Sequence, residues 1–130
     1  ISAYSVAKAA LYRLVEVLHE ELNAQGFDIN CIAPGAVNTG ITEQALQVGK
    51  AALGAVYEMS EKVKAQGGDS PDLVSNTIRR LVSPPCDGLS GRLLSAKWDA
   101  KFLENPAPVL TNPDLLRLRR IDDELFQKKG

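Results

Sequence analysis

The chain has 130 residues, of which 45% are hydrophobic and 24% are charged, a composition typical of an ordinary globular domain. Its 15 basic and 16 acidic residues leave a net charge of −1, so we expect neither nucleic acid nor an anionic membrane as a partner. No apolar run is long enough to span a bilayer and the first residues lack the pattern of a signal peptide, so we expect a cytoplasmic protein.

The first predicted element is a helix over residues 3–25. Ser2 is a suitable N-cap for it, and Gly26 is a suitable left-handed stop. The apolar residues of this segment fall at the spacing of one helical face, at Ala3, Val6, Ala7, Ala10, Leu11, Leu14, Val15, Leu18 and Leu22.

The next segment, "INCIA" at residues 29–33, is a short and nearly continuous apolar run. It ends at Pro34 and Gly35, and it is typical of a strand that is buried on both faces of a parallel sheet. A strand that follows a helix in this way predicts the second half of a βαβ unit.

Residues 40–66 contain helix formers at loosely helical spacing, interrupted by Gly49 and Gly54. Each glycine weakens a helix, so we expect one or two mobile helices that end at the turn residues 67–71. Ser70 and Pro71 then predict the N-cap and the first position of a helix that continues as "DLVSNTIRRLVS".

A turn at residues 86–91 separates that helix from a second predicted buried strand, "RLLSAKW" at residues 92–98. The following segment, residues 104–113, is rich in proline and predicts a connector without a core pattern. Asn112 and Pro113 then predict the start of a short charged helix over residues 114–129.

The order of these elements predicts an α/β layer structure. Two buried parallel strands cannot form a sheet core alone, because parallel sheets need several strands that are covered on both faces. We therefore expect partner strands that this sequence does not contain.

Tyr4 and Lys8 lie four positions apart at the start of the first predicted helix, so their polar ends can face one site. A nearby ammonium stabilises the negative phenolate, which makes the two residues a candidate proton-transfer pair. The spacing alone equally allows an aromatic side chain packed at a helix start and a solvated lysine one turn later.

The segment "APGAVNTG", residues 33–40, follows the first predicted strand, at the sheet edge where open α/β folds bind ligands. Gly35 allows a ligand to approach the backbone closely, and Thr39 offers a hydroxyl. An ordinary turn after a strand would also explain the Pro-Gly pair.

Together, "YSVAKAAL", "INCIAPGAVNTG", "SPDLVSNTIRRLVSP" and "GLSGRLLSAKWD" resemble the carboxy-terminal half of a short-chain dehydrogenase/reductase. The match runs in order over residues 2–99, which makes it more specific than any single motif. The resemblance implies the carboxy-terminal half of a Rossmann-type doubly wound parallel sheet. It also implies hydride transfer between NAD or NADP and a small-molecule alcohol or carbonyl substrate, in the single-domain branch of the family.

By this resemblance, Tyr4 matches the tyrosine that exchanges a proton with the substrate oxygen. Lys8 matches the lysine that binds the nicotinamide ribose and promotes ionisation of that tyrosine. The turn that holds the nicotinamide carboxamide would comprise Pro34, Gly35, Val37 and Thr39. Residues 40–68 would form a variable lid over the substrate, and the family implies a homodimer or homotetramer.

The sequence also departs from the family, because it contains no glycine-rich phosphate loop between a strand and a helix. We expect that loop and the catalytic serine to lie upstream of residue 1, so that the isolated chain is inactive and binds nicotinamide cofactors poorly. Residues 1–99 are predicted to form the carboxy-terminal half of a nucleotide-binding domain, with residues 100–130 as a connector and a helical tail. The alternative is a catalytically inactive member of the same fold that serves as a binding, regulatory or dimerisation protein.

No metal site is predicted. Cys31 and Cys86 are too few and too far apart for a disulfide framework or a metal cluster, and we expect two reduced, half-buried thiols. His19 is the single histidine of the chain, which excludes a multi-histidine metal site. We assign it no catalytic role.

Overall fold

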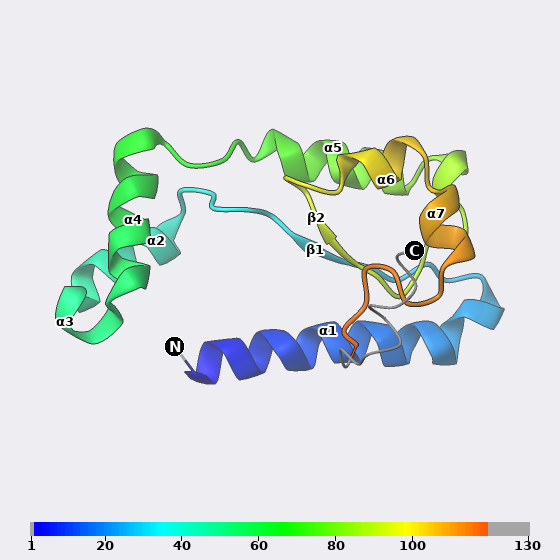
Figure 1. Cartoon of the computed structure of the whole chain (residues 1–130), viewed down its shortest axis with the longest axis horizontal. Coiled ribbons are helices and arrows are strands. Elements are labelled where there is room, and N and C mark those ends of the chain that lie inside the picture. The colour runs from blue at the N-terminus through cyan, green and yellow to red at the C-terminus, as the bar shows by residue number, and fades with distance from the viewer. Residues whose placement is uncertain (1, 120–130) are drawn as a thin grey trace, which may run out of the picture.

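The computed structural model describes residues 2–119 of the chain. Two parallel strands, β1 (Cys31–Ala33) and β2 (Leu93–Ser95), pair with Ile32 opposite Leu94. Figure 1 shows helix α1 (Ser2–Leu22) along one side of the strands and helices α5 (Asp72–Leu81) and α6 (Ala100–Glu104) on the other. These layers around a parallel sheet confirm the predicted α/β fold class.

The first helix is confirmed over almost its whole predicted length. A short 3₁₀ turn, η1 (Asn23–Gln25), follows α1, and Gly26 then ends it in the left-handed conformation with φ of 83°. The N–H of Gly26 donates a hydrogen bond to the carbonyl of Asn23. The predicted N-cap role of Ser2 is wrong, because Ser2 already belongs to the helix.

Both strands are shorter than the sequence predicts, and β1 is half-buried rather than buried on both faces. The reason is that, within residues 2–119, each strand has only the other as its strand partner. Residues beyond Ser95 turn away from the sheet, and the N–H of Ala96 donates the last hydrogen bond to Ala33. The further partner strands stay a prediction.

Residues 40–66 form three helices where one or two were predicted: α2 (Gly40–Val48), α3 (Lys50–Leu53) and α4 (Ala55–Gln66). The breaks fall at the two glycines that the sequence singles out. Gly49 and Gly54 have φ of 90° and 51°. Residues with a Cβ atom rarely adopt such positive φ values, whereas glycine does so readily. In Figure 1 the three helices form a group at the end of the molecule away from α7 (Ala107–Thr111).

The predicted N-cap of α5 is off by one residue, because Pro71 rather than Ser70 directly precedes the helix. The Ser70 hydroxyl accepts a hydrogen bond from the N–H of Asp72 at 3.2 Å. Pro71 precedes the first helical residue rather than occupying it. The helix ends at Leu81, and a 3₁₀ turn, η2 (Pro84–Cys86), follows at the paired prolines.

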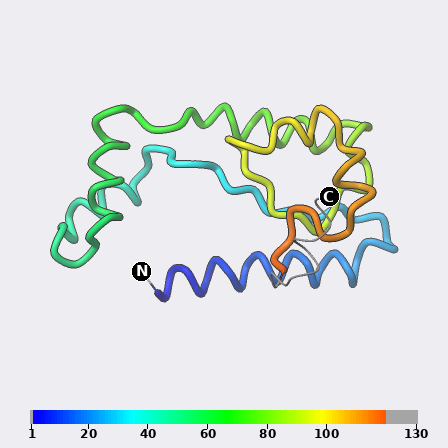
Figure 2. The backbone as a smooth tube through the Cα atoms, in the orientation of Figure 1, coloured from blue at the N-terminus to red at the C-terminus, as the bar shows by residue number. Residues whose placement is uncertain are grey.

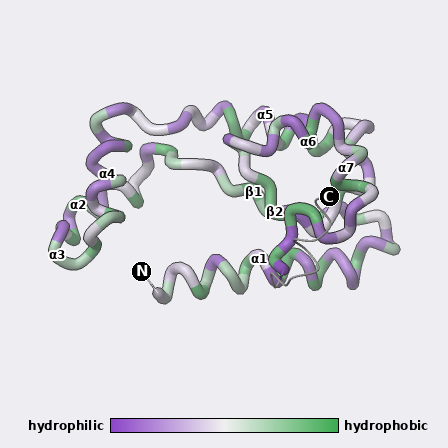
Figure 3. Tube along the Cα trace, in the orientation of Figure 1, coloured by the Kyte–Doolittle hydropathy of each residue, from purple (hydrophilic) through white to green (hydrophobic). Residues whose placement is uncertain are grey.

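The hydrophobic core lies beside β2 and includes residues that the sequence assigned to a connector. Leu103 of α6 and Val109 of α7 are buried, and Val109 has no exposed surface. They pack with Leu89, Leu94 and the fully buried Cys86. The expectation that residues 104–113 lack a core pattern is therefore wrong, whereas the division at residue 99 stays a prediction. Figure 3 shows hydrophobic residues gathered along the two strands.

Residues 112–119 follow α7 without forming a helix, so the predicted helix over 114–129 is wrong as far as residue 119. The rest of that prediction lies outside the described residues. In Figure 2 this orange segment runs from α7 to α1. The N–H of Leu118 donates to the buried carboxylate of Glu16 at 2.8 Å, and Arg92 donates to the carbonyls of Pro113 and Leu115.

Candidate functional site

A cavity of about 550 Å³ opens between the start of α1, the turn after β1 and the helices α2 and α4. It lies beyond the carboxyl ends of the two parallel strands, where open α/β folds bind ligands. Five of the six predicted site residues line it, namely Tyr4, Pro34, Gly35, Val37 and Thr39. The sixth, Lys8, is outside its lining.

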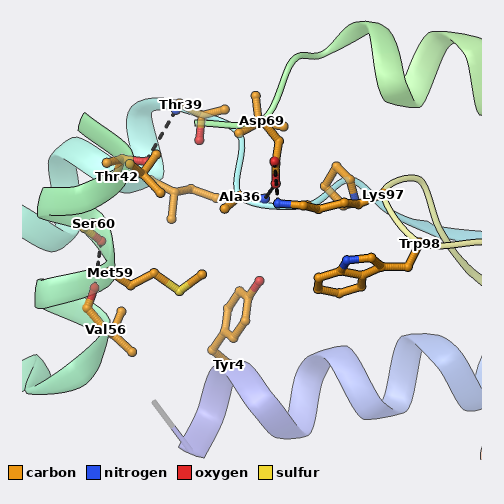
Figure 4. A pocket seen from close by; sticks show the side chains of 15 residues that line it. Tyr4, Ala36, Thr39, Thr42, Val56, Met59, Ser60, Asp69, Lys97 and Trp98 are labelled. Carbon is orange, nitrogen blue, oxygen red and sulfur yellow. Dashed lines mark hydrogen bonds and ion pairs between the residues drawn. The ribbon is translucent and has the colours of Figure 1, made fainter. Parts of the chain in front are cut away.

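Tyr4 enters the cavity from the first turn of α1. Figure 4 shows its ring standing between Met59 and Trp98, with the hydroxyl directed into the space toward the turn after β1. The side chain is 59% exposed, so its hydroxyl can contact a bound molecule.

Lys8 lies one helical turn after Tyr4, as the spacing predicts. Its Nζ atom is 5.5 Å from the centre of the Tyr4 ring, a distance at which an ammonium interacts favourably with an aromatic face. The charge of Lys8 also reaches β1: burial raises the pKa of the Cys31 thiol, and the positive charge of Lys8 acts in the opposite direction. The ammonium is thus close to both the tyrosine and the strand.

The turn after β1 is hydrogen-bonded to Asp69, which follows α4 and the two glycines Gly67 and Gly68. Asp69 accepts a hydrogen bond from the N–H of Ala36 at 2.8 Å, and its own N–H donates to the Ala36 carbonyl at 2.9 Å. Gly35 has φ of +87°, and a Cβ atom there would lie 2.7 Å from Asp69 Oδ2. Only glycine therefore fits at position 35 without a shift of Asp69.

Thr39 ends the turn and precedes the first residue of α2. Its backbone N–H donates to the hydroxyl of Thr42 at 3.5 Å, and the N–H of Thr42 donates to the Thr39 carbonyl at 2.9 Å. These contacts fix the start of α2 against the cavity. The turn is thereby anchored at both ends.

Sequence reasoning missed Asp69, Lys97 and Trp98, which all line the cavity. Lys97 Nζ donates to Asp69 Oδ1 at 2.7 Å. This bond and the Ala36 N–H together hold the pKa of the Asp69 carboxyl below its usual range. The two residues are 28 positions apart, and no local spacing pattern connects residues at that separation.

The outer wall of the cavity is apolar. From the predicted lid, residues 40–68, the apolar side chains of Val56 and Met59 line the cavity. Leu46, Val48 and Leu53 are absent from its lining, and further apolar contacts come from Ile41 and Val63. The indole of Trp98 is 72% exposed and stands across from Tyr4.

Among residues 2–119 there is no group of three or more His, Cys, Asp or Glu side chains that could hold a metal ion. Cys31 is half-buried and Cys86 fully buried, and both are free thiols. His19 is outside the cavity lining. No helix in the described part of the chain is long and apolar enough to cross a membrane.

Comparison of the sequence with known proteins finds relatives of one kind. Residues 1–48 match the family model described as short chain dehydrogenase. The chain is 32% identical over 120 residues to "Short chain dehydrogenase mpl6" of Monascus purpureus, and equally so to "Short chain dehydrogenase citE" of Monascus ruber. In both cases the similarity covers 92% of this chain and 36% of the relative. "Uncharacterized oxidoreductase YmfI" of Bacillus subtilis is 28% identical over 71% of this chain and 36% of its own length.

The fold and the cavity define an α/β protein with a cavity at the carboxyl edge of a parallel sheet. The matches to curated relatives extend over most of the sequence, and together with the family model they support placing the chain in the short-chain dehydrogenase family. It spans about a third of the length of the curated relatives that it matches. No solved structure matches the chain significantly.

Proposed function

We propose that this chain is the catalytic part of an oxidoreductase that interconverts an alcohol and a carbonyl with NAD or NADP. The observation that carries the proposal is that Tyr4 and the Pro34–Thr39 turn, which come from different elements, line one cavity. The similarity to short chain dehydrogenases supports the same activity.

The residues of the cavity fit a nicotinamide group. Gly35, Val37 and Thr39 of the turn line the cavity, where main-chain groups and the Thr39 hydroxyl can serve a carboxamide, which needs hydrogen-bond donors and acceptors. Pro34 and Val37 offer an apolar surface for the ring. The phosphate groups of a dinucleotide find no glycine-rich loop in this sequence, so we propose that an upstream segment binds them.

When bound, the nicotinamide cofactor would donate or accept the hydride. In the direction of reduction, the Tyr4 hydroxyl donates its proton to the carbonyl oxygen of the substrate; in oxidation, Tyr4 takes the proton of the alcohol. Lys8, with its ammonium 5.5 Å from the tyrosine ring centre, stabilises the negative charge that Tyr4 carries after it gives up its proton.

We further propose that residues 40–68 act as the substrate lid and that the substrate is apolar around its reacting group. Val56 and Met59 face the cavity from α4, and Trp98 stands at its opposite side. The charged residues in the lining are Asp69 and Lys97, and they pair with each other at 2.7 Å. A charged substrate would therefore find no unpaired opposite charge among these lining residues.

A homodimer or homotetramer is part of the proposal. Val6 and Leu14 on α1 are 68% and 51% exposed, and exposed apolar helix residues of this kind support an interface. Light scattering on the full-length protein tests it, with a monomer as the contradicting result.

The experiment that tests the activity compares Tyr4→Phe with Tyr12→Phe in the full-length protein. Tyr12 lies on the same helix but outside the cavity lining, so its substitution controls for loss of a phenol from α1. We expect Tyr4→Phe to lower kcat by at least about a hundredfold, the usual contribution of a general acid, with Tyr12→Phe close to wild type. Equal turnover in both variants would contradict the role of Tyr4 as the general acid, and a wild-type protein without turnover would favour the binding or dimerisation protein.

A further inference from the structure

Three segments that are distant in the sequence meet at the side chain of Asp69. One carboxylate oxygen accepts the N–H of Ala36 at 2.8 Å, in the turn after β1. The other accepts the ammonium of Lys97 at 2.7 Å, just after β2. Asp69 itself lies between α4 and α5, so the carboxylate connects the end of the lid to both strand ends (Figure 4).

The backbone around this carboxylate is packed so closely that two glycines are needed. Val37 and Gly68 form an antiparallel bridge, and a Cβ atom on Gly68 would lie 2.5 Å from the carbonyl oxygen of Ala36. A Cβ atom on Gly35 would instead meet a side chain, at 2.7 Å from Asp69 Oδ2. Position 68 is thus closed by backbone and position 35 by the Asp69 carboxylate itself.

The charges at this point are balanced. The Asp69 side chain is 16% exposed and the Lys97 side chain is 42% exposed. Because each carboxylate oxygen already accepts a hydrogen bond from the chain, the geometry suits holding a structure in place rather than contacting a ligand.

We propose that Asp69 is a positioning residue, which fixes the Ala36 peptide and with it the Gly35–Val37 backbone that faces the cavity, while Lys97 fixes Asp69. This inference rests on the proposed function, because the same turn is where the nicotinamide would bind. The ammonium of Lys97 also lies 5.8 Å from the centre of the Trp98 ring, at the wall of the cavity.

The test compares Asp69→Ala and Asp69→Asn with Asp72→Asn in the full-length protein. Asp72 is an exposed acidic residue three positions later and lies outside the cavity lining, so it controls for loss of one negative charge. The readouts are amide hydrogen exchange of residues 34–39 without cofactor, and the dissociation constant for NADH and NADPH from nicotinamide fluorescence.

We expect Asp69→Ala to speed exchange of the turn and to weaken cofactor binding about tenfold, because the turn then samples conformations that cannot bind. Asp69→Asn retains an oxygen for the Ala36 N–H and should be intermediate, and Asp72→Asn should match wild type. The cofactor KM should rise more than kcat falls, whereas damage to folding alone would reduce the active fraction and leave KM unchanged.

Unchanged exchange of the turn in Asp69→Ala, or a cofactor dissociation constant equal to that of Asp72→Asn, overturns the inference while leaving the proposed function intact. A wild-type protein that binds neither NADH nor NADPH overturns the proposed function, and the inference with it.

Discussion

Gly35 gives a sharp test of how the turn after β1 is built. Its φ of +87° lies in the left-handed region, where a residue with a Cβ atom costs about 1–2 kcal/mol relative to glycine. In Gly35→Ala the new Cβ would also lie 2.7 Å from Asp69 Oδ2, so the carboxylate has to move. We therefore expect the free energy of unfolding to fall by about 1–2 kcal/mol from the backbone alone.

The same strain should appear in cofactor binding. If the turn relieves it by leaving the native conformation, the population that can bind falls by about 5- to 30-fold, and the apparent dissociation constant rises by that factor. Urea denaturation and nicotinamide fluorescence on the full-length protein measure the two quantities.

Gly40→Ala is the matched control for this substitution. Gly40 is the first residue of α2, and a Cβ atom there meets nothing within 4 Å. Alanine should therefore be neutral or stabilise the protein by up to about 1 kcal/mol, with cofactor binding unchanged. If Gly35→Ala behaved like Gly40→Ala in both assays, the account of a rigid turn closed by Asp69 would be refuted.

Three further predictions concern the core, a partly buried histidine and the lid. Val109→Ala should lower the free energy of unfolding by about 2–3 kcal/mol, because Val109 has no exposed surface and the substitution leaves a cavity; Leu110→Ala, at a site that is 43% exposed, should cost clearly less, and equal costs would contradict the observed core. Burial and the charge of Arg117 lower the pKa of His19 in the folded protein. Below about pH 6.5 the unfolded state therefore binds more protons at this residue than the folded state does. The free energy of unfolding should decrease as the pH falls from about 6.5 through the lowered pKa of His19. Denaturation between pH 5 and pH 7.5 checks this, and His19→Gln should remove that part of the pH dependence; an unchanged dependence would contradict it. Met59→Ala should lower kcat/KM for an apolar carbonyl substrate about tenfold and spare a small polar one; equal losses for both would count against a hydrophobic lid.

The features that the sequence predicts well are those encoded locally. The apolar face of α1 repeats over five turns, and Gly26 ends the helix as expected. Gly49 and Gly54 break the lid into separate helices because their positive φ values do not suit a helix interior. The turn residues at the end of β1 and Tyr4 meet in one cavity because a parallel sheet brings strand ends and helix starts to the same edge.

The features that the sequence does not predict depend on contacts between distant residues or on ambiguous local signals. Pro106 and Pro108 suggested a connector, yet proline is tolerated in the first turn of a helix, and α7 forms there with Val109 in the core. The pairing of Asp69 with Lys97 has no local signature. The lengths of both strands were overestimated, because the predicted strand segments extend beyond the three residues of each that pair in the described structure.

The most direct test of the account is a titration of the full-length protein with NADH and with NADPH, followed by nicotinamide fluorescence. Tyr4 and the Pro34–Thr39 turn line one cavity, and the account predicts saturable binding of at least one cofactor, weakened in Gly35→Ala and unchanged in Gly40→Ala. Failure of both cofactors to bind would contradict the proposal that this cavity belongs to a nicotinamide-dependent oxidoreductase.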